Sequence, residues 1–296
     1  MITIMGASGN TGRKIAEKLL GAGQKVRVLS RSEARLAELL RAGAQVLSGD
    51  PADAAFLTRS FRGAEAVYTM LPTDRVAADC RAEQDRSGEA IAAAIRDSGV
   101  RHVVALSSLG AELADGTGWI AGLHAQEERL RKIKGLHLLL LRPASFFENF
   151  YELLDLLRED GIVGDAIPAQ LALPMVATRD VAHIAAHALR ARNWRGVVVR
   201  ELLGPRDMTY AEAIRILGMH IGRPDVRYVQ TSYERAARSL IEACRSESFA
   251  SLHVELTRAF AEQMIRPRRG RTPENTTPTR FEDFAGDFAQ VYAAAA

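Results

Sequence analysis

Near the start of the chain stands a glycine-rich stretch, Gly6-Ala7-Ser8-Gly9-Asn10-Thr11-Gly12, which decides the fold. It directly follows an apolar run that predicts a strand, and it opens a segment with apolar residues at helical spacing. In this setting the first glycine permits a tight turn, the second lets the backbone approach a pyrophosphate, and the third allows close helix packing. The N-H groups at the helix start favour phosphate. The stretch therefore predicts a dinucleotide site formed by Gly6, Ser8, Gly9, Asn10, Thr11 and Gly12; a glycine-rich turn without a ligand is the alternative.

Beyond this loop, short apolar runs alternate with amphipathic stretches over the first 145 residues, a pattern typical of βαβ units. Strands are predicted at residues 2–5, 25–29, 44–47, 64–71, 103–107 and 137–141, and a helix at 80–98. We therefore predict an α/β fold, with a doubly wound parallel Rossmann sheet in residues 1–150. The regularity fades afterwards, so residues 151–296 are predicted to form a smaller, mostly helical C-terminal substrate lobe, interleaved with the sheet edge.

The end of the second predicted strand bears on the choice of dinucleotide. NAD is typically held there by a carboxylate that accepts bonds from the ribose hydroxyls. This chain instead has Ser30-Arg31-Ser32, and Arg31 can bond a 2′-phosphate and stack on adenine. NADP(H) is therefore favoured, with NAD(H) as the alternative. Asp50, at the end of the third strand, is predicted either to lie near the adenine or to cap the next turn.

Composition excludes several classes of protein. The 296 residues are 47% hydrophobic and 25% charged, with a net charge of +3 and no long basic tract, so nucleic acid is not an expected partner. The two cysteines lie far apart and suggest neither a disulfide framework nor a metal site. No signal peptide or membrane-spanning run is found. These features predict a soluble, cytoplasmic protein without a membrane partner; a homodimer is compatible with them.

Several motifs together resemble the NmrA-like family of atypical short-chain dehydrogenase/reductase relatives. They are the Gly6 to Gly12 loop, Arg31, Gly49-Asp50, and the segment Leu141-Arg-Pro-Ala-Ser-Phe-Phe-Glu-Asn149. The family includes bacterial NADPH-dependent quinone oxidoreductases, reductases of plant phenolics, and regulators that bind dinucleotide without established turnover. The resemblance implies that the cofactor is bordered by Leu71, Pro72 and Thr73, contacted at the nicotinamide ribose by Ser107, and flanked at the nicotinamide by Pro143, Ala144, Ser145 and Phe146.

The chain lacks the Tyr-x-x-x-Lys pair of typical short-chain dehydrogenases, in which lysine lowers the tyrosine pKa so that the phenol can pass a proton. By spacing, His124 occupies the tyrosine position and Glu128 the lysine position, one helical turn apart. His124 is thus a candidate proton donor supported by Glu128, or a residue that only covers the helix. Ser107 is a candidate hydrogen-bond donor or a plain strand-end serine, and Asn149 faces the substrate or fixes the local backbone.

Two functions remain open from the sequence. An aromatic cluster at Phe146, Phe147, Phe150 and Tyr151 belongs to the core or walls a flat apolar pocket suited to an aromatic or quinone-like small molecule. The first hypothesis is an NADPH-dependent reductase that transfers a hydride to a quinone or similarly activated acceptor. The alternative is a redox sensor that binds NADP(H) and acts through a protein partner. The absence of the Tyr-x-x-x-Lys pair supports this alternative.

Overall fold

A seven-stranded sheet forms the centre of the computed structural model, which describes residues 1–159 and 161–294. Its strand order is β10-β6-β5-β4-β1-β2-β3, and every neighbouring pair is parallel. The strands span β1 Ile2–Ile4, β2 Val26–Ser30, β3 Gln45–Ser48, β4 Ala66–Met70, β5 His102–Leu106, β6 His137–Pro143 and β10 Val197–Leu202. The predicted parallel Rossmann sheet is confirmed.

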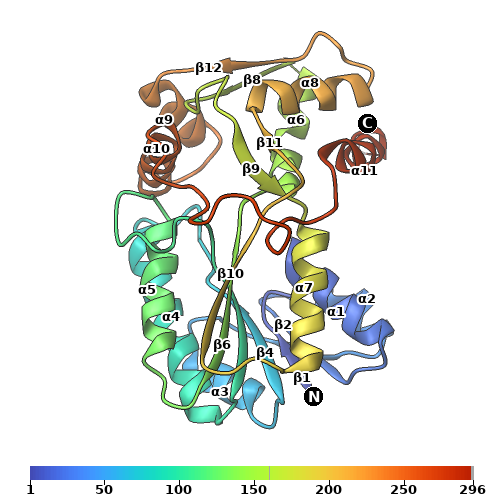
Figure 1. The fold of residues 1–296 in the computed structure, drawn as a ribbon, viewed down its shortest axis with the longest axis vertical. Coiled ribbons are helices and arrows are strands. Elements are labelled where there is room, and N and C mark those ends of the chain that lie inside the picture. The colour runs from blue at the N-terminus through green and yellow to red at the C-terminus, as the bar shows by residue number, and fades with distance from the viewer. Residues whose placement is uncertain (160, 295–296) are drawn as a thin grey trace.

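Helices cover both faces of this sheet (Figure 1). One face carries α1 (Asn10–Gly21), α2 (Ala37–Arg41) with the 3-10 turn Ala34–Leu36, and α7 (Thr178–Ala191); the other carries α3 (Ala54–Phe61), α4 (Cys80–Ser98) and α5 (Ile120–Arg131). Strands buried on both sides must be apolar on both sides. Accordingly Ile4, Val67 and Tyr68 are all fully buried.

The strand order reverses between β1 and β4, because successive strands run outward from β1 in one direction and from β4 in the other. In open α/β sheets, ligands bind outside the carboxyl ends of the strands at such a switch point. The glycine loop follows β1 there, and the segment Leu71 to Thr73 follows β4. The topology therefore brings these two predicted cofactor segments to one place.

After forming the first elements of the C-terminal lobe, the chain returns to the central sheet. Helix α7 packs on α1, and β10 pairs with β6 from Val197↔Leu138 to Leu202↔Pro143. Both elements lie in the segment assigned from sequence to residues 151–296. The sheet and the lobe are therefore interleaved along the chain.

The lobe has a core of its own around small sheets and helices. β9 (Leu173–Val176) pairs with β7 (Ser145–Phe146) and β11 (Asp207–Met208), and β8 (Ile162–Asp165) pairs with β12 (Arg227–Gln230). The helical elements are the 3-10 helix Phe147–Leu153, α6 (Leu154–Glu159), α8 (Tyr210–His220), α9 (Tyr233–Glu242), α10 (Glu247–Ala261) and α11 (Phe281–Ala294). Phe147, Phe281 and Phe288 are buried in the core that these elements share.

The segment between α10 and α11 crosses between the sheet and the lobe (Figure 1). Leu203, just after β10, donates its N-H to the Asn275 carbonyl at 2.8 Å and accepts from the Thr277 N-H at 2.7 Å. Thr279 donates its hydroxyl and its N-H to the Asp180 carboxylate on α7. This segment therefore ties the end of β10 and the start of α7 to the lobe.

Within residues 1–159 and 161–294, none of the helices combines the length and the apolar character that crossing a bilayer requires.

Candidate functional site

The glycine loop makes a tight turn directly after β1. Gly6 has a φ of +67°, a left-handed conformation that favours glycine, and its carbonyl accepts the Gly9 N-H at 3.0 Å. A Cβ at Gly12 would lie 2.4 Å from the Gly6 carbonyl oxygen and 3.1 Å from the Ala7 Cα. These are backbone atoms, which cannot move aside as the end of a flexible side chain can, so only glycine fits at position 12. The first turn of α1 is thus pressed against the loop.

The start of α1 is open to an anion. Gly9 is the N-cap residue, its position offers no side-chain cap, and no acidic residue lies in the first turn. Gly9 and Asn10 are exposed, so the first N-H groups of the helix and its positive dipole end are available to a phosphate. Thr11 is buried, and its hydroxyl accepts from the Tyr68 hydroxyl at 3.2 Å. Burial raises the pKa of Tyr68, so this pair stays neutral and structural.

The end of β2 joins the glycine loop and carries no carboxylate. Ser30 donates its hydroxyl to the Ser8 hydroxyl at 3.0 Å, and Arg31 is exposed beside them. A hollow of about 410 Å³ adjoins the loop, lined by Ser8, Arg13, Ala34, Arg35, Ala37, Glu38 and Arg41. Arg13, which pairs with Glu38 at 2.7 Å, was not selected from sequence, although it directly follows Gly12. This rim is mainly cationic, which suits a phosphate group.

The other predicted cofactor residues on this side have partners of their own. Asp50 accepts the Ala52 N-H at 2.8 Å, which caps the turn after β3, and it lies 3.8 Å from Arg86. Leu71 is buried, Pro72 is half-buried, and the Thr73 hydroxyl accepts from the Gln84 amide at 3.0 Å. Thr73 is thereby held in place at the carboxyl end of β4.

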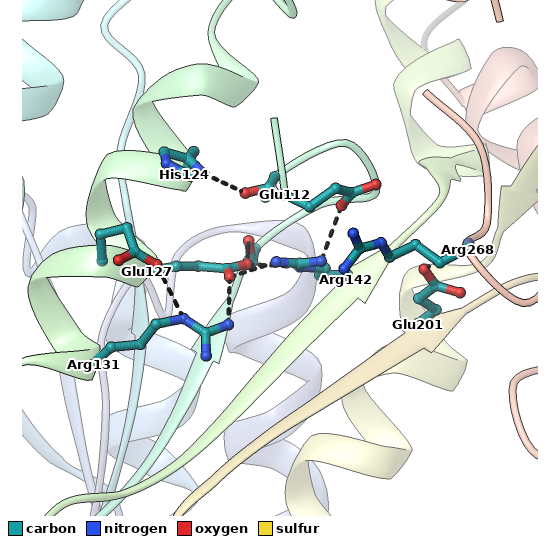
Figure 2. A network of polar contacts seen from close by, with 10 residues as sticks. Glu112, His124, Glu127, Arg131, Arg142, Glu201 and Arg268 are labelled. Carbon is teal, nitrogen blue, oxygen red and sulfur yellow. Dashed lines mark hydrogen bonds and ion pairs between the residues drawn. The ribbon is translucent and has the colours of Figure 1, made fainter. Parts of the chain in front are cut away.

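A buried network of charged groups lies at the carboxyl ends of β5 and β6 (Figure 2). Arg142 bonds Glu127 through two nitrogens, at 2.9 and 2.7 Å, and Glu112 through a third at 2.9 Å. Ser107 donates its hydroxyl to Glu127 at 2.6 Å. The side chains of Arg142 and Glu127 are 5% and 3% exposed. A bidentate ion pair of this kind is strong only because each charge has its partner.

This network decides how Ser107 can act. Its single hydroxyl proton is committed to Glu127, so its oxygen is left with lone pairs and can accept a hydrogen bond from a ligand. Burial alone would lower the pKa of Arg142, but the bonds to Glu127 and the charges of Glu127 and Glu112 outweigh it and raise that pKa. The guanidinium therefore stays charged and keeps Glu127 as an acceptor. The hydrogen-bond donor role expected of Ser107 does not agree with this geometry.

His124 and Glu128 point to different surroundings. His124 lies on α5, and its Nδ1 is 3.0 Å from the Ala111 carbonyl, to which it donates (Figure 2). Glu128 is 48% exposed and pairs with Arg131 at 3.3 Å rather than with His124. The buried carboxylate of this helix is Glu127, which spacing alone did not indicate. His124 thus holds the loop that follows β5.

The segment after β6 is fixed by a buried carboxylate that was also not selected from sequence. Glu148 accepts the Thr178 N-H at the start of α7, accepts the Thr178 hydroxyl, and lies 3.8 Å from the Lys14 ammonium on α1. Pro143 and Ala144 are buried, and Ser145 and Phe146 are half-buried in β7. Asn149 is exposed. Glu148 therefore links the segment expected at the nicotinamide to the helix of the glycine loop.

Most of the aromatic cluster after β6 belongs to the core. Phe147 and Phe150 are buried and pack on Phe281, and Tyr151 stacks on Phe288. Phe146 alone lies apart from this core and packs against the sheet side. Among the described residues, the acidic, histidine and cysteine side chains form no group able to hold a metal ion.

A parallel sheet with a glycine cradle at its switch point defines a protein of the Rossmann class. Within this class the chain belongs to the NmrA-like family, whose model matches residues 1–285. The resemblance expected from the motifs is confirmed.

Known relatives span the whole chain. A "(4-alkanoyl-5-oxo-2,5-dihydrofuran-3-yl)methyl phosphate reductase" from Streptomyces griseus is 29% identical over 302 residues, which cover 99% of each chain. Among solved structures, Citrobacter triphenylmethane reductase with NADP(H) matches with a TM-score of 0.80 at 20% identity, over 98% of this chain and 100% of its own. The NADPH-dependent quinone oxidoreductase QOR2 of Escherichia coli matches with a TM-score of 0.81 at 20% identity, over 97% and 99%. At such identities the solved structures show a shared fold.

Proposed function

We propose that this chain is an NADPH-dependent oxidoreductase that transfers a hydride to a quinone or similarly activated small molecule. The observation that carries the proposal is the glycine cradle, in which Gly12 leaves no room for a Cβ and the α1 N-terminus is open to a pyrophosphate. A bound reduced nicotinamide supplies the hydride. The reductase names of the relatives in this family support the same chemistry.

The residues around the cradle divide into two roles. The first N-H groups of α1, with Ser8 and Asn10 beside them, hold the phosphates. Leu71 to Thr73 border the cofactor, and Pro143 to Phe146 flank its nicotinamide ring. Ser107, fixed by Glu127, accepts a hydrogen bond from the ribose or carboxamide. The protein thus supplies orientation and the exclusion of water.

The acceptor is expected to be electron-poor. Hydride addition to a quinone, or to a carbon-carbon double bond conjugated with carbonyl groups, places the negative charge on a stabilised oxyanion, which needs less help from an acid than an ordinary alkoxide does. This agrees with the absence of a tyrosine between positions 107 and 136. The Streptomyces relative's name describes an acceptor of the second kind, an unsaturated lactone with an acyl substituent.

The direct test follows NADPH oxidation at 340 nm with a panel of quinones, conjugated enones and acylated unsaturated lactones, with NADH in parallel. We expect turnover with at least one acceptor, and faster turnover with NADPH than with NADH. Cofactor binding is measured separately by fluorescence titration. Tight NADPH binding without turnover of any acceptor would contradict the reductase function and favour a redox sensor.

Replacing Arg31 with alanine is expected to weaken NADPH binding about tenfold or more and to change NADH binding little. The reason is that a charge-assisted bond to the 2′-phosphate contributes about 1.5–3 kcal/mol, and NADH lacks that phosphate. Dissociation constants for both dinucleotides measure the effect. Arg59→Ala, at an exposed arginine on α3, is the control. An equal loss for NADPH and NADH would rule out the 2′-phosphate role; Arg35→Ala then tests the neighbouring hollow.

A redox sensor is the second candidate, and one observation favours it. The Ser107 hydroxyl and the His124 Nδ1 are both committed to protein acceptors, so neither offers a free proton from that atom. A sensor must bind the oxidised and reduced dinucleotide with different affinity, because equal affinities shift no equilibrium. Equal dissociation constants for NADP⁺ and NADPH, in the absence and presence of cell extract, would argue against it.

A further inference from the structure

A histidine-carboxylate pair lies in the lobe, between α10 and the end of β8. His253 on α10 places its Nε2 3.0 Å from Asp165 Oδ1, at the end of β8, and the two side chains are 19% and 20% exposed. The Ala166 N-H donates to the same oxygen at 2.7 Å and fixes the carboxylate. Because a carboxylate accepts, Nε2 carries the shared proton. The His253 Nδ1 has no hydrogen-bond partner in the part of the chain described here.

Aromatic contacts connect this pair to the loop that follows β5. The His253 ring centroid lies 5.8 Å from that of Trp119, the residue that precedes α5. Trp119 in turn stacks on Phe249, one helical turn before His253, at 5.0 Å and 4°. The Gln84 amide donates to the Trp119 carbonyl at 3.1 Å and to the Thr73 hydroxyl at 3.0 Å. His253 is therefore linked through Trp119 and Gln84 to the segment expected to border the cofactor.

Hydrogen bonds also hold the start of helix α10 against the loop between β4 and α4 and against the start of α4. The Ser246 N-H donates to the Arg75 carbonyl at 3.0 Å, and the Cys80 N-H donates to the Ser248 hydroxyl at 3.0 Å. A Cβ at Gly118 would lie 2.1 Å from the Leu252 carbonyl oxygen, so the helix backbone touches the loop after β5. The loops after β4 and β5 thus fix where His253 lies, on the side where α/β sheets bind ligands.

We propose that His253, held by Asp165, is the residue that donates the proton to the reduced acceptor. The proposal rests on the proposed reductase function. When the acceptor has taken up the hydride, an electron pair is left on its oxygen. The N-H bond at Nδ1 of protonated His253 breaks, and an O-H bond forms on the acceptor oxygen. The ring is then neutral, and its remaining proton stays on Nε2, hydrogen-bonded to Asp165. Water then restores the proton.

The charges around the ring suit this role. Asp165 is the carboxylate in contact with the ring, and it fixes the Nε2 proton so that Nδ1 is the nitrogen left for a ligand. Tyr228 on β12 donates its hydroxyl to the Asp165 carbonyl at 3.1 Å. Arg75 on the β4-α4 loop lies over the Phe249 ring, and its charge is balanced by Glu152. By contrast, the Ser107 hydroxyl proton is bonded to Glu127, and the proton on His124 Nδ1 is bonded to the Ala111 carbonyl. Neither of these two protons is free for the acceptor.

His253→Gln is the sharpest test, because the amide can still donate to Asp165 but cannot release a proton. We expect kcat to fall about 100-fold, the usual share of a general acid, with the NADPH dissociation constant unchanged. The decline of kcat at rising pH, which reports the acid, should disappear. The control is His220→Gln, at an exposed histidine near the end of α8, which should keep both kcat and its pH profile.

Asp165→Asn adds a readout that does not depend on turnover. The ring resonances of His253 in NMR spectra, recorded at one pH, should move in this variant, because the amide holds the Nε2 proton less firmly than the carboxylate does, and kcat should move to a lower value with them. Movement of one without the other would overturn the proposal, as would a His253→Gln variant with wild-type kcat or with an unaltered pH profile. Failure of the reductase function itself is recognised separately, because the wild-type chain would then oxidise NADPH with none of the acceptors, and no oxyanion would form for His253 to protonate.

Discussion

Gly12→Ala is expected to abolish cofactor binding at concentrations where the wild-type chain is saturated, a loss of about 100-fold or more in affinity. The added methyl group would lie 2.4 Å from the Gly6 carbonyl oxygen and 2.8 Å from the Gly6 carbonyl carbon. The loop and the first turn of α1 must therefore separate, and the N-H groups that face the phosphates move with them. Fluorescence titration with NADPH measures the affinity, and circular dichroism checks that the fold survives.

Gly21→Ala is the matched control in the same helix, since a Cβ there meets no atom within 4 Å. Alanine favours helix over glycine by up to about 1 kcal/mol, so this variant should be at least as stable as the wild type and bind NADPH normally. If Gly12→Ala bound NADPH as tightly as Gly21→Ala does, the cradle would not be the dinucleotide site.

Glu127→Gln is expected to lower the free energy of unfolding by about 3 kcal/mol, the lower end of the cost of breaking a buried ion pair. The variant leaves the Arg142 guanidinium buried with Glu112 as its remaining close carboxylate, and Ser107 loses a charged acceptor. Denaturation in urea measures the effect as a lower midpoint at an unchanged m-value. The neutral glutamine oxygen holds the Ser107 hydroxyl proton less firmly, so NADPH binding should weaken as well.

The neighbouring residue provides the control for this experiment. Glu128→Gln removes the same charge one position along α5, where the side chain is 48% exposed and its pair with Arg131 is open to solvent. Exposed pairs contribute about 0–1 kcal/mol, so the stability should change little. Equal losses in the two variants would mean that the buried network does not support the fold.

Much of the fold could be predicted from local sequence patterns. The helix expected at residues 80–98 is found as Cys80–Ser98, because Asp79 caps its start and Gly99, with a φ of 76°, ends it. The glycine loop was recognisable because its spacing follows a strand and opens a helix. The place of β10 beside β6 could not be predicted in this way, because a short apolar run does not indicate which strand it pairs with.

The buried network around Arg142 and Glu127 could not be predicted from the sequence, for a different reason. Spacing selected Glu128, whereas the structure buries Glu127; one position rotates a side chain by about 100° around a helix, and motif spacing does not determine that phase so finely. The pair of His253 and Asp165 brings together residues far apart in the chain, which only the packing of α10 against the loops after β4 and β5 reveals.

The return of the chain to its own sheet sets the order in which a newly made protein can fold. As the chain leaves the ribosome, its first 150 residues contain six of the seven sheet strands but neither β10 nor α7. The face of α1 that α7 covers stays exposed until residue 191 has emerged, and the edge of β6 stays unpaired until residue 202 has emerged. Such an edge can pair with other chains. The sheet is therefore completed only after the first part of the lobe, from β7 to β9, has been synthesised, and before the helices α8 to α11 exist.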